Sequence, residues 1–237
     1  MRLSTMSLVA APHRRLALSL LAAGLTLPSV AQAKPDRLKS VLSEMDAASA
    51  KFHSAQADVK KEHFEKIVND TSGDSGSVYF LRVGIGTQAG VKLENGQVFE
   101  YKNGAGRLYN AQTNHLDRFS TSGSNQARAE AFLTLGFGGT GSDLAKAWTI
   151  TDQGTEQMND GSKNIDVEKL DLVSKEASVR NNYSHITIWV DPARDISLKQ
   201  IFFTPSGDTD SATYKNFRLN QSIDLKKFAI QCKGKCS

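Results

Sequence analysis

The chain has 237 residues and a formal net charge of +4, and three of its positive charges are arginines close to the N-terminus. The remaining residues therefore carry about +1 and are nearly neutral. A nearly neutral chain gives no support to nucleic-acid binding, which needs a clustered basic face.

The N-terminal stretch has the pattern of a secretory signal peptide. An apolar run, Leu16–Leu27, follows the arginines and ends at Pro28, and Ala31-Gln32-Ala33 supplies small residues for cleavage after Ala33. The run is too short for a membrane span, and no later stretch has the roughly 18 apolar residues that a span needs. We expect residues 1–33 to be removed, leaving a single domain, 34–237, in the periplasm with no stable membrane span.

The segment Pro35–Ala55 is predicted to be an amphipathic helix that lies across one face of a sheet. Its apolar residues recur at helical spacing: Leu38, Val41, Leu42, Met45, Ala48 and Phe52. Plain core packing and the covering of a lipid cavity both fit this stripe, and both remain open.

Beyond this helix the pattern changes to strands. Those predicted before residue 125 are a polar, edge-like Ala57–Val68, then Ser75–Val83, Val98–Tyr101 and Arg107–Ala111, and one short strand within 110–125. Those predicted after the centre are Thr149–Thr155, Ile165–Val173, Ser184–Val190, Leu198–Thr204 and Ala212–Asn220. About ten strands joined by short turns form an antiparallel sheet that curls strongly. The fold class is therefore mainly β with helices (α+β), an unclosed half-barrel.

The centre, Ala129–Trp148, is predicted to be a helix, a glycine break and a second short helix with Ser142 at its N-cap. The glycines of the break are Gly136, Gly138, Gly139 and Gly141, which we interpret as a lid hinge. Their G-x-G-x-x-G spacing also matches a dinucleotide-binding turn, but that turn must follow a strand within a βαβ unit. A hinge is the better interpretation.

No catalytic, metal or cofactor site is predicted. Gly73-Asp74-Ser75-Gly76 resembles the surroundings of a trypsin-like nucleophile, but Ser75 comes early and leads into a strand, so a polar turn fits better. The histidines are scattered and no acids can be paired, so we expect a protein that is not an enzyme. Cys232 and Cys236 are expected to form a small disulfide loop, because a metal would need more ligands.

Several segments resemble the periplasmic outer-membrane lipoprotein carrier family, which is LolA-like. They are Phe132-Leu133-Thr134-Leu135-Gly136-Phe137-Gly138-Gly139-Thr140-Gly141-Ser142-Asp143-Leu144, Gly76–Arg82, Ser184–Pro192, Lys199-Gln200, Tyr214-Lys215-Asn216 and Phe228. The resemblance runs over nearly all of residues 34–237. After Arg82 the family's Arg-Pro and aromatic-rich strand are replaced by a shorter, glycine-rich Val83–Gly90, so this part of the chain departs from the family pattern.

The resemblance implies an open antiparallel barrel whose helical lid covers an apolar cavity for the acyl chains of a lipoprotein. The family's arginine at this position holds the lid shut by hydrogen bonds to lid backbone, and carbonyls near Leu135 and Gly136 would be the acceptors for Arg82. An arginine at the end of a strand that extends to solvent is the alternative. Residues expected at the cavity are Val78, Phe80, Phe132, Leu133, Leu135, Phe137, Trp189 and Phe202. The implied partners are acylated lipoprotein or lipid cargo, an inner-membrane donor complex and an outer-membrane acceptor, with the carrier a monomer. A lipid-sensing or scaffolding module of the same fold, and an exported lipid hydrolase, are the alternatives.

Overall fold

The computed structural model describes residues 37–84, 86–102, 104–120 and 135–236. All of them belong to one compact unit, Lys34–Ser237, and the expected signal peptide lies outside the described residues. Cleavage after Ala33 and the two-part division of the chain therefore stay predictions.

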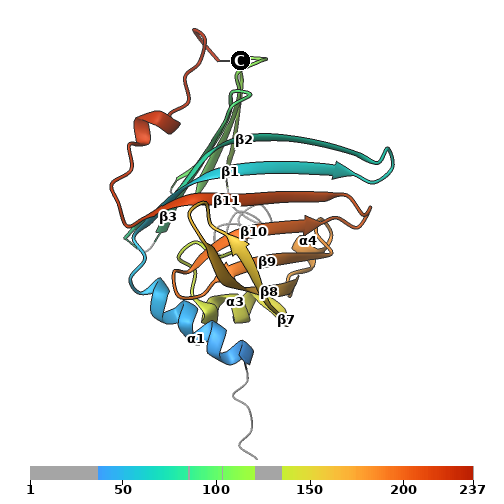
Figure 1. Ribbon diagram of the computed structural model, residues 1–237. Helices are drawn as coiled ribbons and strands as arrows, with labels where there is room; N and C mark the ends of the chain where they lie inside the picture. The colour runs from blue at the N-terminus through green and yellow to red at the C-terminus, as the bar shows by residue number, and fades with distance from the viewer. Residues whose placement is uncertain (1–36, 85, 103, 121–134, 237) are drawn as a thin grey trace, which may run out of the picture. The chain divides into compact units, whose positions relative to one another are not determined.

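One antiparallel sheet of eleven strands forms the body of this unit (Figure 1). The strand order is β6-β5-β4-β3-β2-β1-β11-β10-β9-β8-β7, and the described residues contain no pairing that joins β6 to β7. The predicted unclosed antiparallel sheet is thus confirmed. The strands are β1 (Ser54–Glu65), β2 (Asp70–Val83), β3 (Gly86–Leu93), β4 (Gln97–Lys102), β5 (Ala105–Asn110), β6 (His115–Ser120), β7 (Trp148–Asn159), β8 (Asn164–Ser174), β9 (His185–Asp191), β10 (Ile196–Phe203) and β11 (Thr209–Leu219).

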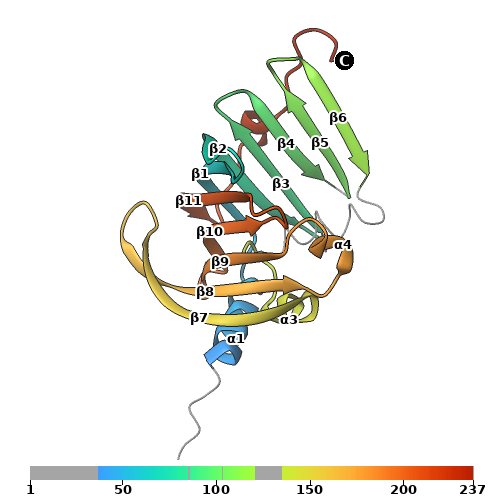
Figure 2. The same cartoon turned by 90° about the vertical axis from the view of Figure 1, so that its right-hand side faces the viewer.

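Two helices, α1 (Arg37–Ser49) and α3 (Gly141–Ala147), pack together against the half of the sheet that contains β7 to β10 (Figure 2). Val41 and Met45 of α1 are buried there, as the apolar stripe of the sequence predicted. Their cluster contains Leu144, Trp148, Leu170, Leu172, Ile186, Ile188 and Val190. Two short elements complete the described chain, α4 (Ala177–Arg180) and the 3-10 helix η1 (Leu225–Phe228).

The beginning of α3 differs from the prediction. Its N-cap is Thr140, whose side-chain oxygen accepts a hydrogen bond from the backbone N–H of Asp143 at 2.9 Å. Ser142 instead donates its hydroxyl to Asp46 of α1, at 2.7 Å, and its backbone N–H to the same carboxylate at 3.0 Å. These bonds hold the pKa of Asp46 below its usual value. The acidic side chain thereby fastens α3 to α1.

Two strand predictions are also corrected. The segment predicted as an exposed edge is β1, which lies in the middle of the sheet between β2 and β11. Its polar residues 60–65 belong to a long hairpin with β2, so they pair on both sides yet remain largely exposed. Strand β3 begins at Gly86, within the glycine-rich segment after Arg82, and continues to Leu93, and it was not predicted.

Candidate functional site

A cavity of about 560 Å³ opens on the concave face of the sheet. Its wall is mostly apolar and comes from both halves of the sheet, on either side of the β1–β11 pair. The apolar and aromatic lining residues are Val59, Val78, Phe80, Ala89, Val91, Leu93, Phe99, Tyr101, Leu108, Phe119, Tyr183, Phe202, Ala212 and Tyr214. Its volume lies within the range of about 300–1,000 Å³ that is usual for small-molecule sites.

Polar side chains are few in this lining, and they are Lys61, Gln97, Gln200, Asp210 and Ser211. Asp210 accepts a bond from the imidazole of His63, with 2.8 Å between Nδ1 and Oδ1, and this raises the pKa of the histidine. The cavity therefore combines a large apolar wall with a small charged region on β1 and β11.

The predicted cavity residues fall into three groups. Val78, Phe80 and Phe202 line the cavity. Leu135 and Trp189 do not line it. Leu135 is buried among the helices. Trp189 follows Ile188 on β9, and because Ile188 packs on the helices, Trp189 points to the opposite face of the sheet. Trp189 instead donates its indole N–H to Glu156 at 2.7 Å, and Lys169 and Lys199 each lie 5.1 Å from its ring. Phe137 is also absent from the lining, and Phe132 and Leu133 are outside the described residues.

Phe137 packs against Phe80 but is not one of the residues that line the cavity. Its ring stacks on that of Phe80, with centroids 3.8 Å apart, and meets Tyr214 edge-on at 5.0 Å. Only 2% of Phe137 is exposed. Through this ring, the segment that the sequence assigned to a lid packs on side chains of β2 and β11.

This lid segment, residues 135–140, is bonded to β10 through its backbone. The carbonyl of Gly136 accepts from the backbone N–H of Ser197 at 2.8 Å, and Phe137 makes a β-bridge to Ile196. The carbonyl of Leu135 accepts from the hydroxyl of Ser197 at 3.0 Å and from the amide of Gln200. Gln200 in turn accepts from the hydroxyl of Tyr214, whose pKa is raised by burial. The lid is therefore joined to β10 next to Gln200 and Tyr214, two residues that line the cavity.

Arg82, at the end of β2, binds the lid and α1 together. It donates to the carbonyl of Ser49 at 2.8 Å, to the Ser49 hydroxyl at 3.1 Å, and to the carbonyl of Gly138. The predicted acceptors, the carbonyls of Leu135 and Gly136, are bonded instead to β10. Contact with lid backbone was thus expected, but with the wrong carbonyls.

Two glycines of the lid, Gly138 and Gly141, lie where neighbouring atoms leave no room for a side chain. Gly138 has φ +79°, and a Cβ there would lie 2.4 Å from Cδ1 of Phe52. A Cβ on Gly141 would lie 2.2 Å from the Leu42 carbonyl oxygen of α1. Close packing at both positions, and the left-handed backbone at Gly138, are therefore enough to explain these glycines, and no hinge motion is needed. Gly136 and Gly139 belong to the same segment, and a hinge remains a prediction.

Asp195 is fully buried in the turn between β9 and β10, next to the lid. Its backbone carbonyl accepts from Gly138 N–H at 3.4 Å, while neither carboxyl oxygen has a hydrogen-bond partner among the described residues. Burial raises the pKa of Asp195 to about 7, which the positive charge of Arg82 partly opposes. Asp46 on α1 is the other charged group that acts on it.

Several residues of this site were not predicted: Ser49, Asp195, Ser197, Gln200 and Tyr214. Asp195 follows a Pro-containing turn and looks like an ordinary turn residue, and Ser49 is one polar residue at a helix end. Only Gln200 and Tyr214 fell in segments that the resemblance had singled out. Within the described residues, no group of three metal-ligating side chains comes together, and no helix is long and apolar enough to cross a membrane.

We compared the chain with known proteins to find those with a similar sequence or fold. No family model matches the chain, and no curated protein matches it. Among solved structures, an uncharacterized conserved protein from Thermus thermophilus has 12% identity and a TM-score of 0.50, covering 84% of this chain and 96% of its own. MucB has 12% identity and a TM-score of 0.51, covering 82% of this chain and 63% of its own. A LolA superfamily protein from Nitrosomonas europaea has 16% identity and a TM-score of 0.38, covering 81% and 97%.

One of these neighbours is described as a LolA superfamily protein. At these identities the likeness concerns the fold alone.

Proposed function

We propose that the protein is a periplasmic carrier that holds the acyl chains of a lipoprotein, or of a similar lipid, in this cavity and moves them toward the outer membrane. The observation that supports it best is the 560 Å³ cavity, whose wall is mostly apolar. Burial of each CH₂ contributes about 0.8 kcal/mol, so two chains give strong binding without any polar contact.

A carrier must also release its cargo. Leu135 to Gly138 is held to β10 and Arg82 by backbone hydrogen bonds, which can be exchanged for bonds with water. Phe137 fills space that an acyl chain could take. In this proposal cargo displaces Phe137 and favours an open lid, and closure returns the cargo to an acceptor. The donor complex, the acceptor and the monomeric state belong to the same proposal, which includes no catalysis.

The test is mass spectrometry of lipids and acyl-peptides that copurify with the exported protein. Leu108→Asp places a charge on the cavity wall, at a residue already 41% exposed. Leu225→Asp is the matched control, because Leu225 is 38% exposed and does not line the cavity. We expect Leu108→Asp to remove the bound lipid and Leu225→Asp to retain it.

Three other outcomes count against a carrier. Equal lipid in both variants contradicts the cavity as the site. Lipid that is bound but never passes to acceptor vesicles indicates the sensing module, and release of free fatty acid indicates a hydrolase.

A further inference from the structure

The last described segment, Asp224–Cys236, runs across the convex face of the sheet, opposite the cavity. We call it the C-terminal strap. Phe228 meets the Tyr79 ring at 4.7 Å, and Ile230 donates its N–H to Glu100 at 3.2 Å. Further on, Ile230, Cys232 and Cys236 pack on Val98, Tyr109 and Leu116, the convex-side residues of β4, β5 and β6.

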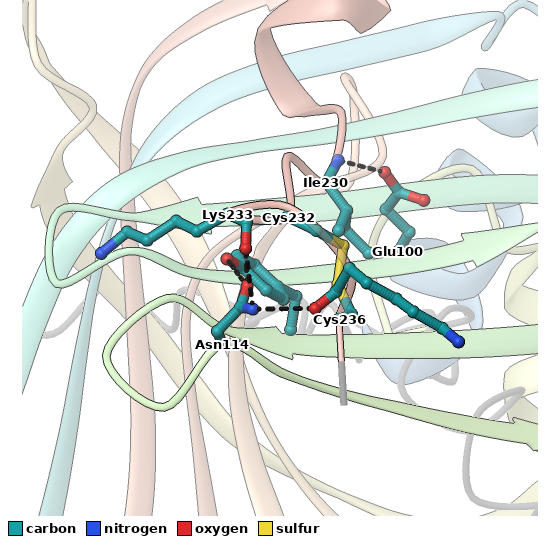
Figure 3. The surroundings of a disulfide bond; sticks show 8 residues. Glu100, Asn114, Ile230, Cys232, Lys233 and Cys236 are labelled. Atoms are coloured by element: carbon teal, nitrogen blue, oxygen red, sulfur yellow. Dashed lines mark hydrogen bonds between the residues drawn. A yellow bond between two sulfur atoms is a disulfide. The ribbon is translucent and has the colours of Figure 1, made fainter.

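The end of the strap is fixed in place. Cys232 and Cys236 form a disulfide, as the sequence predicted (Figure 3). The side chain of Asn114, in the β5–β6 turn, accepts from Lys233 N–H at 2.9 Å and donates to the carbonyls of Lys233 and Lys235, both at 3.1 Å. In Figure 3 the Lys233 side chain extends away from the disulfide. The backbone is thus held while the lysines project outward.

Exposed cations gather on this side of the molecule. The strap contributes four and strands β3 to β6 contribute four more. We call this set the basic face: Lys92, Lys102, Arg107, Arg118, Lys226, Lys227, Lys233 and Lys235. Apart from Arg107, which pairs with Glu100, none has an ion-pair partner among the described residues.

The cations of the basic face are not balanced locally. Residues 86–120 and 224–236 contain eight Lys and Arg against four Asp and Glu. Of these acids, Glu100 is already engaged, and Asp117 lies opposite Leu108 on the cavity side. Because residues 34–237 carry only about +1 in total, the rest of the domain is acidic, at about −3. These two segments therefore carry a net charge of +4, although Asp58, Glu62 and Glu94 line the same hollow as Lys92 and Lys227.

We infer that the basic face docks the protein on an anionic lipid surface. Each Lys or Arg close to such a surface strengthens binding about fivefold, an effect that salt screens over about 10 Å. The paired strands and the fixed strap present these cations together without the ordering that a flexible tail would need. Since the cavity opens on the opposite face, cargo can enter or leave while the protein is docked.

The test uses the full protein without cargo, in flotation with phosphatidylcholine vesicles containing increasing phosphatidylglycerol. We expect binding to rise with the anionic fraction and to be lost on raising salt from about 0.05 M to 0.5 M. Replacing Lys226, Lys227, Lys233 and Lys235 together by Gln should weaken it at least tenfold.

The matched control replaces four exposed lysines elsewhere, Lys39, Lys51, Lys66 and Lys163, with the same change in net charge. This variant should bind like the wild type, and circular dichroism should show both variants folded. The inference would be overturned by equal loss of binding in the two variants, by equal binding to uncharged vesicles, or by no vesicle binding at low salt. The last outcome would favour an acidic protein partner. The vesicle result does not depend on the carrier proposal, because preloaded cargo should leave it unchanged.

Discussion

Phe137 and Phe80 stack face to face, with their ring centroids 3.8 Å apart and their planes within 8°. One ring comes from the lid and the other from the cavity wall, so this contact joins the movable part of the proposed mechanism to the fixed part. The strength of this contact helps to decide how firmly the lid is held against the cavity wall.

Phe137→Ala should therefore weaken the fold and enlarge the cavity. Removing a buried phenylalanine ring typically lowers the free energy of unfolding by about 3–5 kcal/mol. Phe119→Ala is the comparison, because Phe119 is a partly exposed cavity-wall residue whose ring lies 6.3 Å from that of Phe99. Urea denaturation should give a clearly smaller loss in the free energy of unfolding for Phe119→Ala. Equal losses would show that Phe137 does not hold the lid against Phe80.

Arg82→Leu should weaken the closed lid by about 1.5–3 kcal/mol, the usual worth of hydrogen bonds to a charged group. The open, cargo-bound state makes fewer of these bonds, so we expect uptake to persist and release to acceptor vesicles to slow. Arg82→Lys should do little better, because an ammonium group cannot reach Ser49 and Gly138 with a planar fork. Arg218→Leu, at an exposed position on β11, is the control. Wild-type release by Arg82→Leu would contradict the role.

Gly138→Ala is expected to lower the melting temperature, whatever it does to cargo exchange. The new Cβ would meet Phe52, and φ +79° is unfavourable for alanine. Gly86→Ala should be tolerated, since the nearest neighbouring atom, the Val83 carbonyl oxygen, is 3.7 Å from the added Cβ and no positive φ is involved. Thermal denaturation of both variants distinguishes close packing from a free hinge, for which Gly138→Ala would leave the melting temperature unchanged.

Asp195 should make the protein less stable as pH rises. Its folded-state pKa, about 7, exceeds the ordinary value of 3.8. Below that ordinary value both states hold the proton and nothing is lost. Between the two values only the folded state keeps it, so stability falls as pH rises and the full penalty, at most roughly 4 kcal/mol, is reached above about pH 7.

Asp195→Asn removes this dependence and keeps the shape, and asparagine also tolerates the φ of +52°. We expect the variant to melt above the wild type at about pH 8, with the difference shrinking toward about pH 4. Asp70→Asn, at the exposed first residue of β2, should show no such trend. A constant offset between Asp195→Asn and wild type across this range would mean that the carboxyl does not titrate there.

The architecture was readable from the sequence where the signal was local. Alternating strands and the stripe of α1 each depend on neighbouring residues, and the strands with their short turns predicted the antiparallel sheet. Strand β3 was missed because Gly86, Gly90 and Gln88 weaken its alternation, which becomes visible only at Val91 and Leu93.

The site was less readable because its contacts join distant segments. Arg82 was identified, but its acceptor Ser49 lies on a helix whose end position no local pattern fixes. Trp189 was placed in the cavity because aromatic residues suit it, whereas the register of β9 turns it toward Glu156. Likewise Ser142 fits an N-cap, yet Asp46 binds it more effectively from another helix.

The strand order has a consequence for how the chain folds. Strands β1 to β6 form one run of neighbouring hairpins and β7 to β11 form another, and the two runs meet where β1 pairs with β11, from Ala55 opposite Leu219 to Phe64 opposite Thr209. Each run can form from local contacts, but this seam closes a very long loop and should be the slow step. A chain that emerges N-terminus first cannot complete the seam until β11 has arrived, so β1 must wait with one side unpaired and exposed to aggregation.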